Sequence, residues 1–252
     1  MGTILAIANQ KGGVGKTTTA INLGAALAAF EKRVLLVDCD PQGNATRGVG
    51  ERASIPHLYH SLIGDVPLTE VARPTTFPNL DLVPADRDLV GVEVEFVGNP
   101  GWEQRLKGAL GSVASRYDFL LLDCPPSLGH LTVGALSAAD GVVVPLQCEY
   151  FALEGISELV ATVRRVQAGL NPRLRVEGIL LTMYDERTNL GRDIVEEVRR
   201  HFGDKVFRTV VPRNVRLAEA PSHGQPIIQY DIKSRGAEAY LALAREILAR
   251  HP

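Results

Sequence analysis

The sequence is poor in cysteine and contains no cysteine pair. Its 252 residues include three cysteines, and Cys39, Cys124 and Cys148 lie far apart with no Cys-x-x-Cys spacing. Neither a disulfide framework nor a structural zinc site is therefore indicated. The chain also lacks an apolar run of the roughly 18 residues that a membrane-spanning helix needs. Its first residues, MGTILAIANQK, have neither the basic stretch nor the apolar length of a secretion signal, which predicts a cytoplasmic protein.

The formal net charge is only −2, but the basic residues are concentrated in the C-terminal part. Residues 1–159 contain 11 lysines and arginines against 18 acidic residues, and residues 160–252 contain 16 against 11. A basic surface of this kind fits contact with a polyanion, and it also fits an ordinary solvated helix surface. With 45% hydrophobic and 22% charged residues, the composition is that of a soluble globular protein.

Short apolar runs alternate with longer amphipathic stretches. The apolar runs, several of them apolar throughout as in strands buried on both faces, are 4–9, 34–38, 80–85, 119–123, 141–146, 176–183 and 206–211. The stretches with apolar residues at helical spacing are 16–29, 102–116, 151–170, 190–202 and 234–250. This alternation predicts one α/β domain over residues 1–252, with a mostly parallel twisted sheet and helices on both faces. Residues 41–79 are expected to be irregular apart from a short helix.

The first apolar run leads into a glycine-rich loop, QKGGVGKTTT (10–19), and then into a helical stretch. Glycines let backbone N–H groups point inward around phosphate oxygens, and the following helix presents its positive end to the same anion. In the Walker A pattern, Lys16 reaches the β- and γ-phosphates and the Thr17 hydroxyl ligates Mg²⁺. The sequence therefore predicts a P-loop NTPase with ATP and Mg²⁺ as cofactors. The ATP-binding residues expected within the loop are Gly12, Gly13, Val14, Gly15, Lys16, Thr17 and Thr18.

The match to the Walker A pattern G-x-x-x-x-G-K-[ST] is incomplete, because Gln10 occupies its first glycine position. A glycine-rich turn that binds nothing is the plain alternative. The order of buried strand, loop and helix favours phosphate binding instead. A dinucleotide-binding fingerprint is disfavoured, since the G-x-G-x-x-G spacing is absent.

Three aspartates follow apolar strands and are expected to face the phosphate loop. Asp38 and Asp40 close the run VLLVDCD, and Asp123 closes FLLLD. Ligands of open α/β sheets bind at the carboxyl ends of the strands. Asp123 fits the Walker B pattern, in which the aspartate holds Mg²⁺ through a water or polarises the Thr17 hydroxyl. Asp38 has the alternative of a helix-capping or turn-forming role before Pro41.

Several blocks of the sequence match one family. KGGVGKTT (11–18) resembles the deviant Walker A box of the ParA/MinD family of ATPases, to which nitrogenase iron protein is related. Four further blocks resemble those of its chromosomal ParA/Soj partition subfamily: LLVDCDPQGNAT (35–46), FLLLDCPPSLG (119–129), VVVPLQCEYFALEG (142–155) and VPRNVRLAEAPSHGQPI (211–227). The resemblance covers nearly the whole chain.

This resemblance implies roles for the two lysines and the aspartates. Lys11 is the signature lysine that crosses to the ATP of a partner subunit, where it offsets the repulsion between two buried nucleotides. Lys11 is therefore expected to be one of the ATP-binding residues. The expected catalytic residues are Lys11, Lys16 and Asp40. Asp40 orients or activates the attacking water, and Asp38 lies near Mg²⁺ through a water. The segment CPPSLGHL (124–131) is expected to act as a switch that rearranges when the γ-phosphate leaves.

The resemblance also implies contacts in the C-terminal part. In VPRN (211–214), Pro212 is expected to pack on the adenine and Asn214 to hydrogen-bond its edge, with Met183 as an apolar wall. A turn without a ligand is the alternative. Arg187, Arg216 and Arg235 are the candidate DNA-binding residues of a basic surface that forms across an ATP-bound homodimer.

The implied function is an ATP-dependent partition ATPase that is cytoplasmic and associated with the nucleoid. It binds double-stranded DNA without sequence preference, and a ParB-type partner stimulates its hydrolysis. The cargo, chromosome or plasmid or another body, stays open. A MinD-like positioning ATPase is the alternative, but only four residues follow the apolar stripe that ends at Leu248, so we expect no membrane anchor. An iron–sulfur ATPase is disfavoured because Cys124 lies at the wrong place for a shared cluster.

Overall fold

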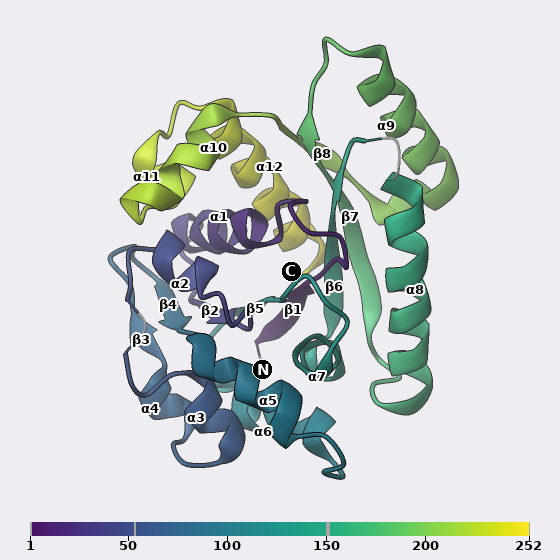
Figure 1. Cartoon of the computed structure of the whole chain (residues 1–252). Coiled ribbons are helices and arrows are strands. Elements are labelled where there is room, and N and C mark those ends of the chain that lie inside the picture. The colour runs from purple at the N-terminus through teal and green to yellow at the C-terminus, as the bar shows by residue number, and fades with distance from the viewer. Residues whose placement is uncertain (1, 53, 150–151, 252) are drawn as a thin grey trace.

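The computed structural model describes residues 2–52, 54–149 and 152–251. An eight-stranded sheet runs through it in the order β3-β4-β2-β5-β1-β6-β7-β8 (Figure 1). All neighbouring strands pair in parallel except β3 and β4, which are antiparallel. This confirms the expected α/β class with a mostly parallel sheet. The strands are β1 (Thr3–Ile7), β2 (Val34–Asp38), β3 (Arg73–Pro74), β4 (Leu80–Val83), β5 (Phe119–Asp123), β6 (Gly141–Gln147), β7 (Arg175–Tyr184) and β8 (Val206–Pro212).

Helices cover both faces of the sheet. The α-helices are α1 (Lys16–Ala29), α2 (Asn44–Gly48), α3 (Leu58–Ile63), α4 (Leu68–Val71), α5 (Gly91–Glu95), α6 (Arg105–Gly111), α7 (His130–Ala138), α8 (Ala152–Gly169), α9 (Asn189–Phe202), α10 (Val215–Glu219), α11 (Ile227–Tyr230) and α12 (Arg235–Arg250). Short 3-10 turns are η1 (Arg87–Val90), η2 (Trp102–Gln104), η3 (Ala114–Arg116), η4 (Gly203–Lys205) and η5 (Ala220–His223).

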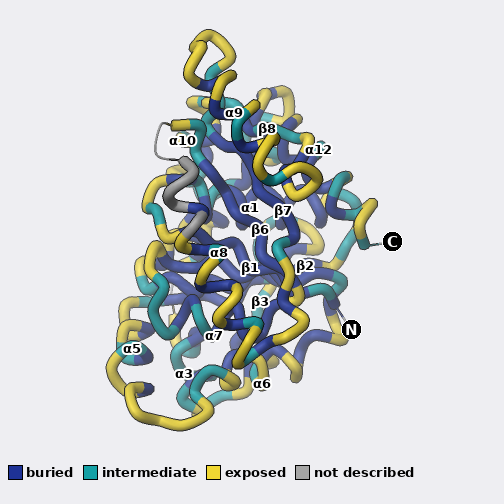
Figure 2. Tube along the Cα trace, turned by 90° about the vertical axis from the view of Figure 1, so that its right-hand side faces the viewer, coloured by how far each residue is buried: buried dark blue, intermediate teal, exposed yellow. Residues whose placement is uncertain are grey.

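Two apolar cores lie on opposite faces of the sheet because successive strand residues point to opposite sides. Leu5 and Ile7 of β1 belong to the core beneath α1 and α12, and Ile4 and Ala6 belong to the core on the α7 and α8 side. In Figure 1 the C-terminal helices lie with α1 above the sheet, and α3 to α7 lie below it. The tube in Figure 2 is buried along the central strands and exposed mainly at loops. Strands buried on both faces explain the uniformly apolar runs in the sequence.

Two sequence expectations differ from the structure. Residues 41–79 contain three short helices and the edge strand β3 rather than one helix, because Leu58, Leu62, Leu68 and Val71 are buried in the core. The helix expected over 102–116 is interrupted, and only α6 is α-helical within it. Phe151, where another helix was expected to begin, lies outside the described residues.

The strand register gathers the predicted site at one edge of the sheet. Asp123 at the end of β5 pairs with Ile7 of β1 on one side and with Asp38 of β2 on the other. The glycine loop follows β1, so the loop and both aspartates meet where the parallel strands end. This is the edge at which open α/β sheets bind ligands.

Candidate functional site

The glycine loop is held in a phosphate-binding shape by its backbone and by two buried side chains. Gly13 and Gly15 have φ values of 74° and 88°, in the left-handed region that favours glycine. Asn9 donates from Nδ2 to the Pro145 carbonyl at 2.8 Å and accepts from the Lys11 amide at 3.0 Å. Thr182 donates its hydroxyl to the Val14 carbonyl at 2.9 Å. The loop is therefore fixed to β6 and β7 before any ligand binds.

Lys16 lies inside this loop. Its ammonium donates to the Lys11 carbonyl at 3.0 Å, and the residue is only 7% exposed. Burial lowers the pKa of Lys16, although the nearby Asp123 and Asp40 carboxylates act in the opposite direction. The first turn of α1 has no acidic residue, so the helix end and the ammonium together present positive charge to an anion.

Asp38 is fully engaged by donors of its own chain. It accepts from the Thr46 amide at 2.8 Å, from the Thr46 hydroxyl at 2.7 Å and from the Asp40 amide at 3.1 Å. Burial nevertheless raises the pKa of Asp38 to about 6. These hydrogen bonds hold the segment that follows β2 against Asp38, in agreement with the turn-forming alternative.

Asp123 differs from Asp38 in its hydrogen bonds. It is fully buried, and neither of its carboxylate oxygens has a hydrogen-bond partner within the described residues. Burial, and next the charge of Asp38, hold the pKa of Asp123 well above its ordinary value, although the Thr17 side chain and Lys16 favour the charged form. A buried carboxylate without donors is costly unless a cation compensates it. The donor set of Asp123 and the Thr17 hydroxyl therefore fits Mg²⁺.

Asp40 is buried, whereas Lys11 is partly exposed. Asp40 is 7% exposed, and its Oδ1 accepts from the Gln42 amide at 2.9 Å. The Lys11 ammonium instead lies 3.4 Å from Oε2 of Glu149, and its side chain is 38% exposed. The structure brings Lys16, Thr17, Asp38, Asp40 and Asp123 together at the carboxyl edge of the sheet, and it pairs Lys11 with Glu149.

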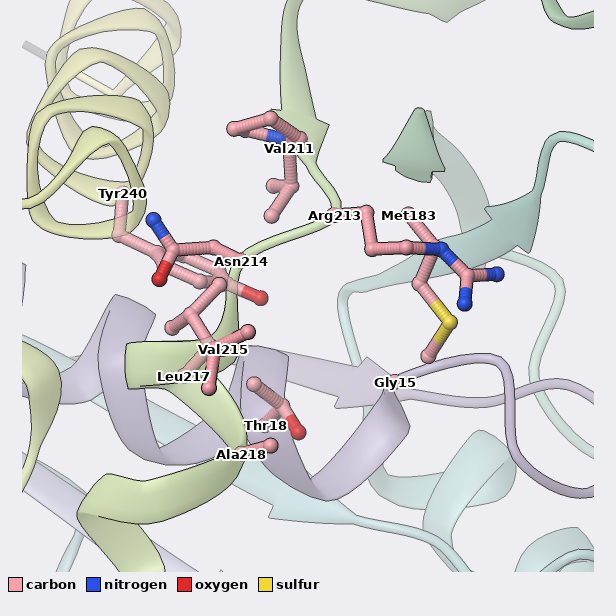
Figure 3. A pocket seen from close by; sticks show the side chains of 11 residues that line it. Gly15, Thr18, Met183, Val211, Arg213, Asn214, Val215, Leu217, Ala218 and Tyr240 are labelled. Atoms are coloured by element: carbon pink, nitrogen blue, oxygen red, sulfur yellow. The ribbon is translucent and has the colours of Figure 1, made fainter. Parts of the chain in front are cut away.

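The three predicted adenine contacts line one cavity of about 370 Å³ (Figure 3). Met183, Pro212 and Asn214 share it with Gly15 and Thr18 of the loop and helix α1, and with Tyr240 of α12. Oδ1 of Asn214 accepts from the Arg216 amide at 2.8 Å. The amide nitrogen of Asn214 is then the group left to donate to a base edge. An apolar cavity next to a phosphate loop has the form of a nucleotide-base pocket.

A family model described as "AAA domain" matches residues 2–176. The "sporulation initiation inhibitor protein Soj" of Bacillus subtilis is 59% identical over 99% of both chains. The "chromosome partitioning protein ParA" of Myxococcus xanthus is 56% identical over 99% of this chain and 89% of its own. The chain belongs to the ParA/Soj family of chromosome-partitioning ATPases.

Solved structures agree with ATP and Mg²⁺ as the cofactors of this ParA/Soj chain. A Mycobacterium smegmatis structure named "cobyrinic acid a,c-diamide synthase", with bound ADP and magnesium, is 40% identical with a TM-score of 0.87 and covers 100% of this chain and 95% of that one. The "septum site-determining protein MinD" of Pyrococcus horikoshii, complexed with Mg-ADP, is 25% identical with a TM-score of 0.80, and covers 98% and 96%.

The three candidate DNA-binding arginines each pair with a carboxylate of the same chain. Arg187 contacts Asp185 at 2.6 Å, and Arg235 contacts Glu186 at 3.2 Å. Arg216 lies 2.9 Å from Glu219 and 3.6 Å from Asp231. The Arg235–Glu186 pair places the N-terminus of α12 beside the segment after β7, so Arg187 and Arg235 share one surface.

None of the described helices is long and apolar enough to cross a membrane.

Sequence reasoning missed the residues that support this site from a distance. Asn9, Thr46 and Thr182 position the loop and Asp38, and Glu149 holds Lys11. Glu93 of α5 accepts the His130 and Leu131 amides at 3.0 and 3.2 Å, which caps α7 where the predicted switch segment ends. Asn9 lies next to the loop and Thr46 lies in the block after Asp38, so both are polar residues close to apolar runs. This proximity is the one feature of the sequence that could have identified them.

Replacing Thr46 with valine is expected to lower the free energy of unfolding by about 2–4 kcal/mol. The Thr46 hydroxyl donates to Asp38 and also accepts from the Ala85 amide at 3.1 Å. Its loss leaves the buried Ala85 amide unpaired, at about 1–3 kcal/mol, and removes one hydrogen bond to Asp38, at about 1 kcal/mol, while the Thr46 amide still donates to Asp38. Denaturant unfolding measures the change. Thr162→Val is the control, since within the described residues that buried hydroxyl accepts only from the Arg165 side chain. An equal loss in both variants would contradict the bridging role of Thr46.

Proposed function

We propose that this chain is a DNA-partitioning ATPase that binds Mg-ATP, dimerises around two nucleotides, binds DNA without sequence preference and is released by hydrolysis. The observation that carries the proposal is the buried carboxylate of Asp123, which has no hydrogen-bond partner in the described part of the chain, near Lys16 and the left-handed glycines of the loop. These groups together can bind both a polyphosphate and a divalent cation. The relatives that are 59% and 56% identical carry partition names, which supports this function over that named in the 40% identical structure.

The residues of one chain account for nucleotide binding and water activation. The loop amides and Lys16 hold the β- and γ-phosphates, while Met183, Pro212 and Asn214 hold the base. Thr17 and Asp123 would hold Mg²⁺, which offsets phosphate charge when it is bound, with Asp38 near it through a water. Asp40, buried at the carboxyl edge, orients or activates the attacking water.

Dimerisation follows in this proposal from the position of Lys11. Within the described residues its partly exposed ammonium pairs only with the half-exposed Glu149. A surface pair of this kind contributes about 0–1 kcal/mol, so exchanging Glu149 for the phosphates of a facing ATP costs little. Each nucleotide then receives one lysine from each subunit, which reduces the repulsion between the two ATP molecules. Hydrolysis would in this way depend on dimer formation.

DNA binding is proposed for the surface that carries Arg187, Arg216 and Arg235. Two subunits would double the number of neutralised phosphates, and the affinity would fall steeply with salt. A ParB-type partner would stimulate hydrolysis and release the protein from the nucleoid. A MinD-like positioning role is the second candidate, supported by the 25% identical MinD structure.

DNA binding is expected to require ATP and to decline steeply as salt increases. Binding of the full chain to random duplex DNA is measured with ATP, with ADP and without nucleotide, at salt concentrations from about 50 to 200 mM, over which several phosphate contacts produce a large change. If the protein binds no DNA with ATP, with ADP or without nucleotide, although ATP still causes it to dimerise, the partition role is wrong. Binding of the ATP form to anionic lipid vesicles would then favour the MinD-like role.

A matched pair of arginine variants locates the DNA surface. Arg235→Ala is expected to weaken binding and to reduce the salt slope by about one for each DNA phosphate that the variant no longer neutralises. Arg33→Ala is the control, because Arg33 is also an exposed arginine and pairs with Asp118 at 3.2 Å. Arg33 directly precedes β2 and therefore lies at the amino ends of the parallel strands, opposite the nucleotide site. Equal weakening in both variants would exclude a localised DNA surface.

A further inference from the structure

A second polar cavity lies next to the candidate catalytic residues and outside the nucleotide pocket. It encloses about 380 Å³, between the turn after Asp40 and the segment that follows β4. Most of the side chains that line it are polar or charged, and Pro41 and Ala85 add apolar surface. The lining includes Gln42, Gly43, Asp86 and three arginines, Arg47, Arg52 and Arg87. The function proposed above gives none of these arginines a role.

The three arginines bring excess positive charge into this cavity. No ion pair engages any of them within the described part of the chain. Arg47 donates to the neutral side chain of Asn44 at 2.8 Å, and the one carboxylate of the lining, Asp86, accepts from the backbone amide of Arg87. Three guanidinium groups thus face a single carboxylate in a concave space, where their mutual repulsion favours an anionic ligand.

We propose that this cavity binds the phosphate or diphosphate group of a small ligand other than the ATP at the glycine loop. Planar guanidinium groups match phosphate oxygens with paired hydrogen bonds, which favours phosphate over a simple halide. The cavity is as large as the base pocket, so it has room for a diphosphate and part of the molecule that carries it. The three arginines of the lining favour a polar, anionic ligand over an uncharged lipid.

The walls of the cavity are hydrogen-bonded directly to the catalytic edge. The Gly43 amide donates to the Asp40 carbonyl at 2.8 Å, and Thr46 connects Asp38 with Ala85 across the cavity wall. A ligand held between Arg47, Arg52 and Arg87 therefore restrains the turn that carries Asp40. The ligand changes the turnover of ATP, a consequence that rests on the proposed function.

Titration calorimetry with pyrophosphate and with inorganic phosphate tests the binding site on the full chain saturated with a fluorescent ADP. The expected result is saturable heat without loss of the ADP signal, because the ligand does not compete for the glycine loop. The double variant Arg52→Ala/Arg87→Ala is expected to weaken binding by about 10-fold or more, since two charge-assisted hydrogen-bond donors are removed. Arg173→Ala, an exposed arginine before β7 at the other edge of the sheet, is expected to bind as wild type does.

The two probes distinguish the possible sources of the anion. Binding of inorganic phosphate at least as tight as that of pyrophosphate assigns the cavity to free phosphate, and tighter binding of pyrophosphate assigns it to a diphosphate-bearing ligand. Heat that appears only as ADP is displaced, an absence of saturable binding, or equal weakening in Arg173→Ala would each overturn the site. Pyrophosphate should also change the rate of ATP hydrolysis in wild type and not in the double variant. Since binding is measured with ADP alone, failure of the proposed ATPase function leaves the binding result interpretable.

Discussion

Replacing Lys16 with alanine is expected to abolish nucleotide binding. The Lys16 ammonium is buried in the glycine loop, and among the described residues it donates one hydrogen bond, to the Lys11 carbonyl. An ammonium has three donors, so phosphate oxygens can accept the others. Loss of a buried charged partner costs about 3–5 kcal/mol, which corresponds to a decrease of roughly 100-fold or more in affinity. Equilibrium binding of fluorescent ATP and ADP measures the effect, and thermal unfolding shows whether the variant is folded.

Lys11→Ala is the matched control for this loss of charge. It removes a lysine from the same loop, but its ammonium lies outside the pocket beside Glu149. We expect Lys11→Ala to bind ADP within a few-fold of wild type and to lose ATP-dependent dimerisation and hydrolysis. Retention of tight ATP binding by a folded Lys16→Ala protein would overturn the assignment of the phosphate site.

The parts of the fold that were predictable from sequence are those that depend on local pattern. β1, β2 and β5 are buried on both faces, so their apolar runs indicate central strands. The glycine loop was equally predictable, because Gly13 and Gly15 occupy backbone conformations that other residues avoid. Asp38 and Asp123 were expected to lie close together because they close parallel strands, and they are register partners.

The remaining features depend on contacts between distant parts of the chain. Within 41–79, α3 buries two leucines and α4 buries a leucine and a valine, which no periodic pattern over four to six residues reveals. Asn9 reaches Pro145 and Thr182 reaches Val14, pairs that only the assembled sheet brings together. Asp185 and Glu219, which pair with Arg187 and Arg216, lie two or three residues away in the sequence. Whether such an exposed pair forms nevertheless depends on side-chain conformation.

Replacing Asp40 with alanine is expected to retain ATP binding and to trap the ATP-bound dimer. Asp40 lies at the carboxyl edge of the sheet but does not form part of the glycine loop, so nucleotide affinity should change by only a few-fold. Removing a residue that orients or activates water lowers turnover by about 100-fold to 10,000-fold. Phosphate release measures turnover, and light scattering after incubation with Mg-ATP measures the dimer. The trapped dimer is also expected to bind random duplex DNA more tightly than wild type.

Asp40→Asn separates the charge of this side chain from its effect on the turn that follows. Oδ1 of Asp40 accepts the Gln42 amide at 2.9 Å, and an asparagine side chain preserves this acceptor and the shape of the turn. A carboxamide is not a general base, so both variants should lose turnover alike if the carboxylate acts on water. Wild-type turnover in Asp40→Ala removes Asp40 from the mechanism. Loss in Asp40→Ala with normal turnover in Asp40→Asn shows that Asp40 acts by shaping the turn, which leaves the activation of water to another group.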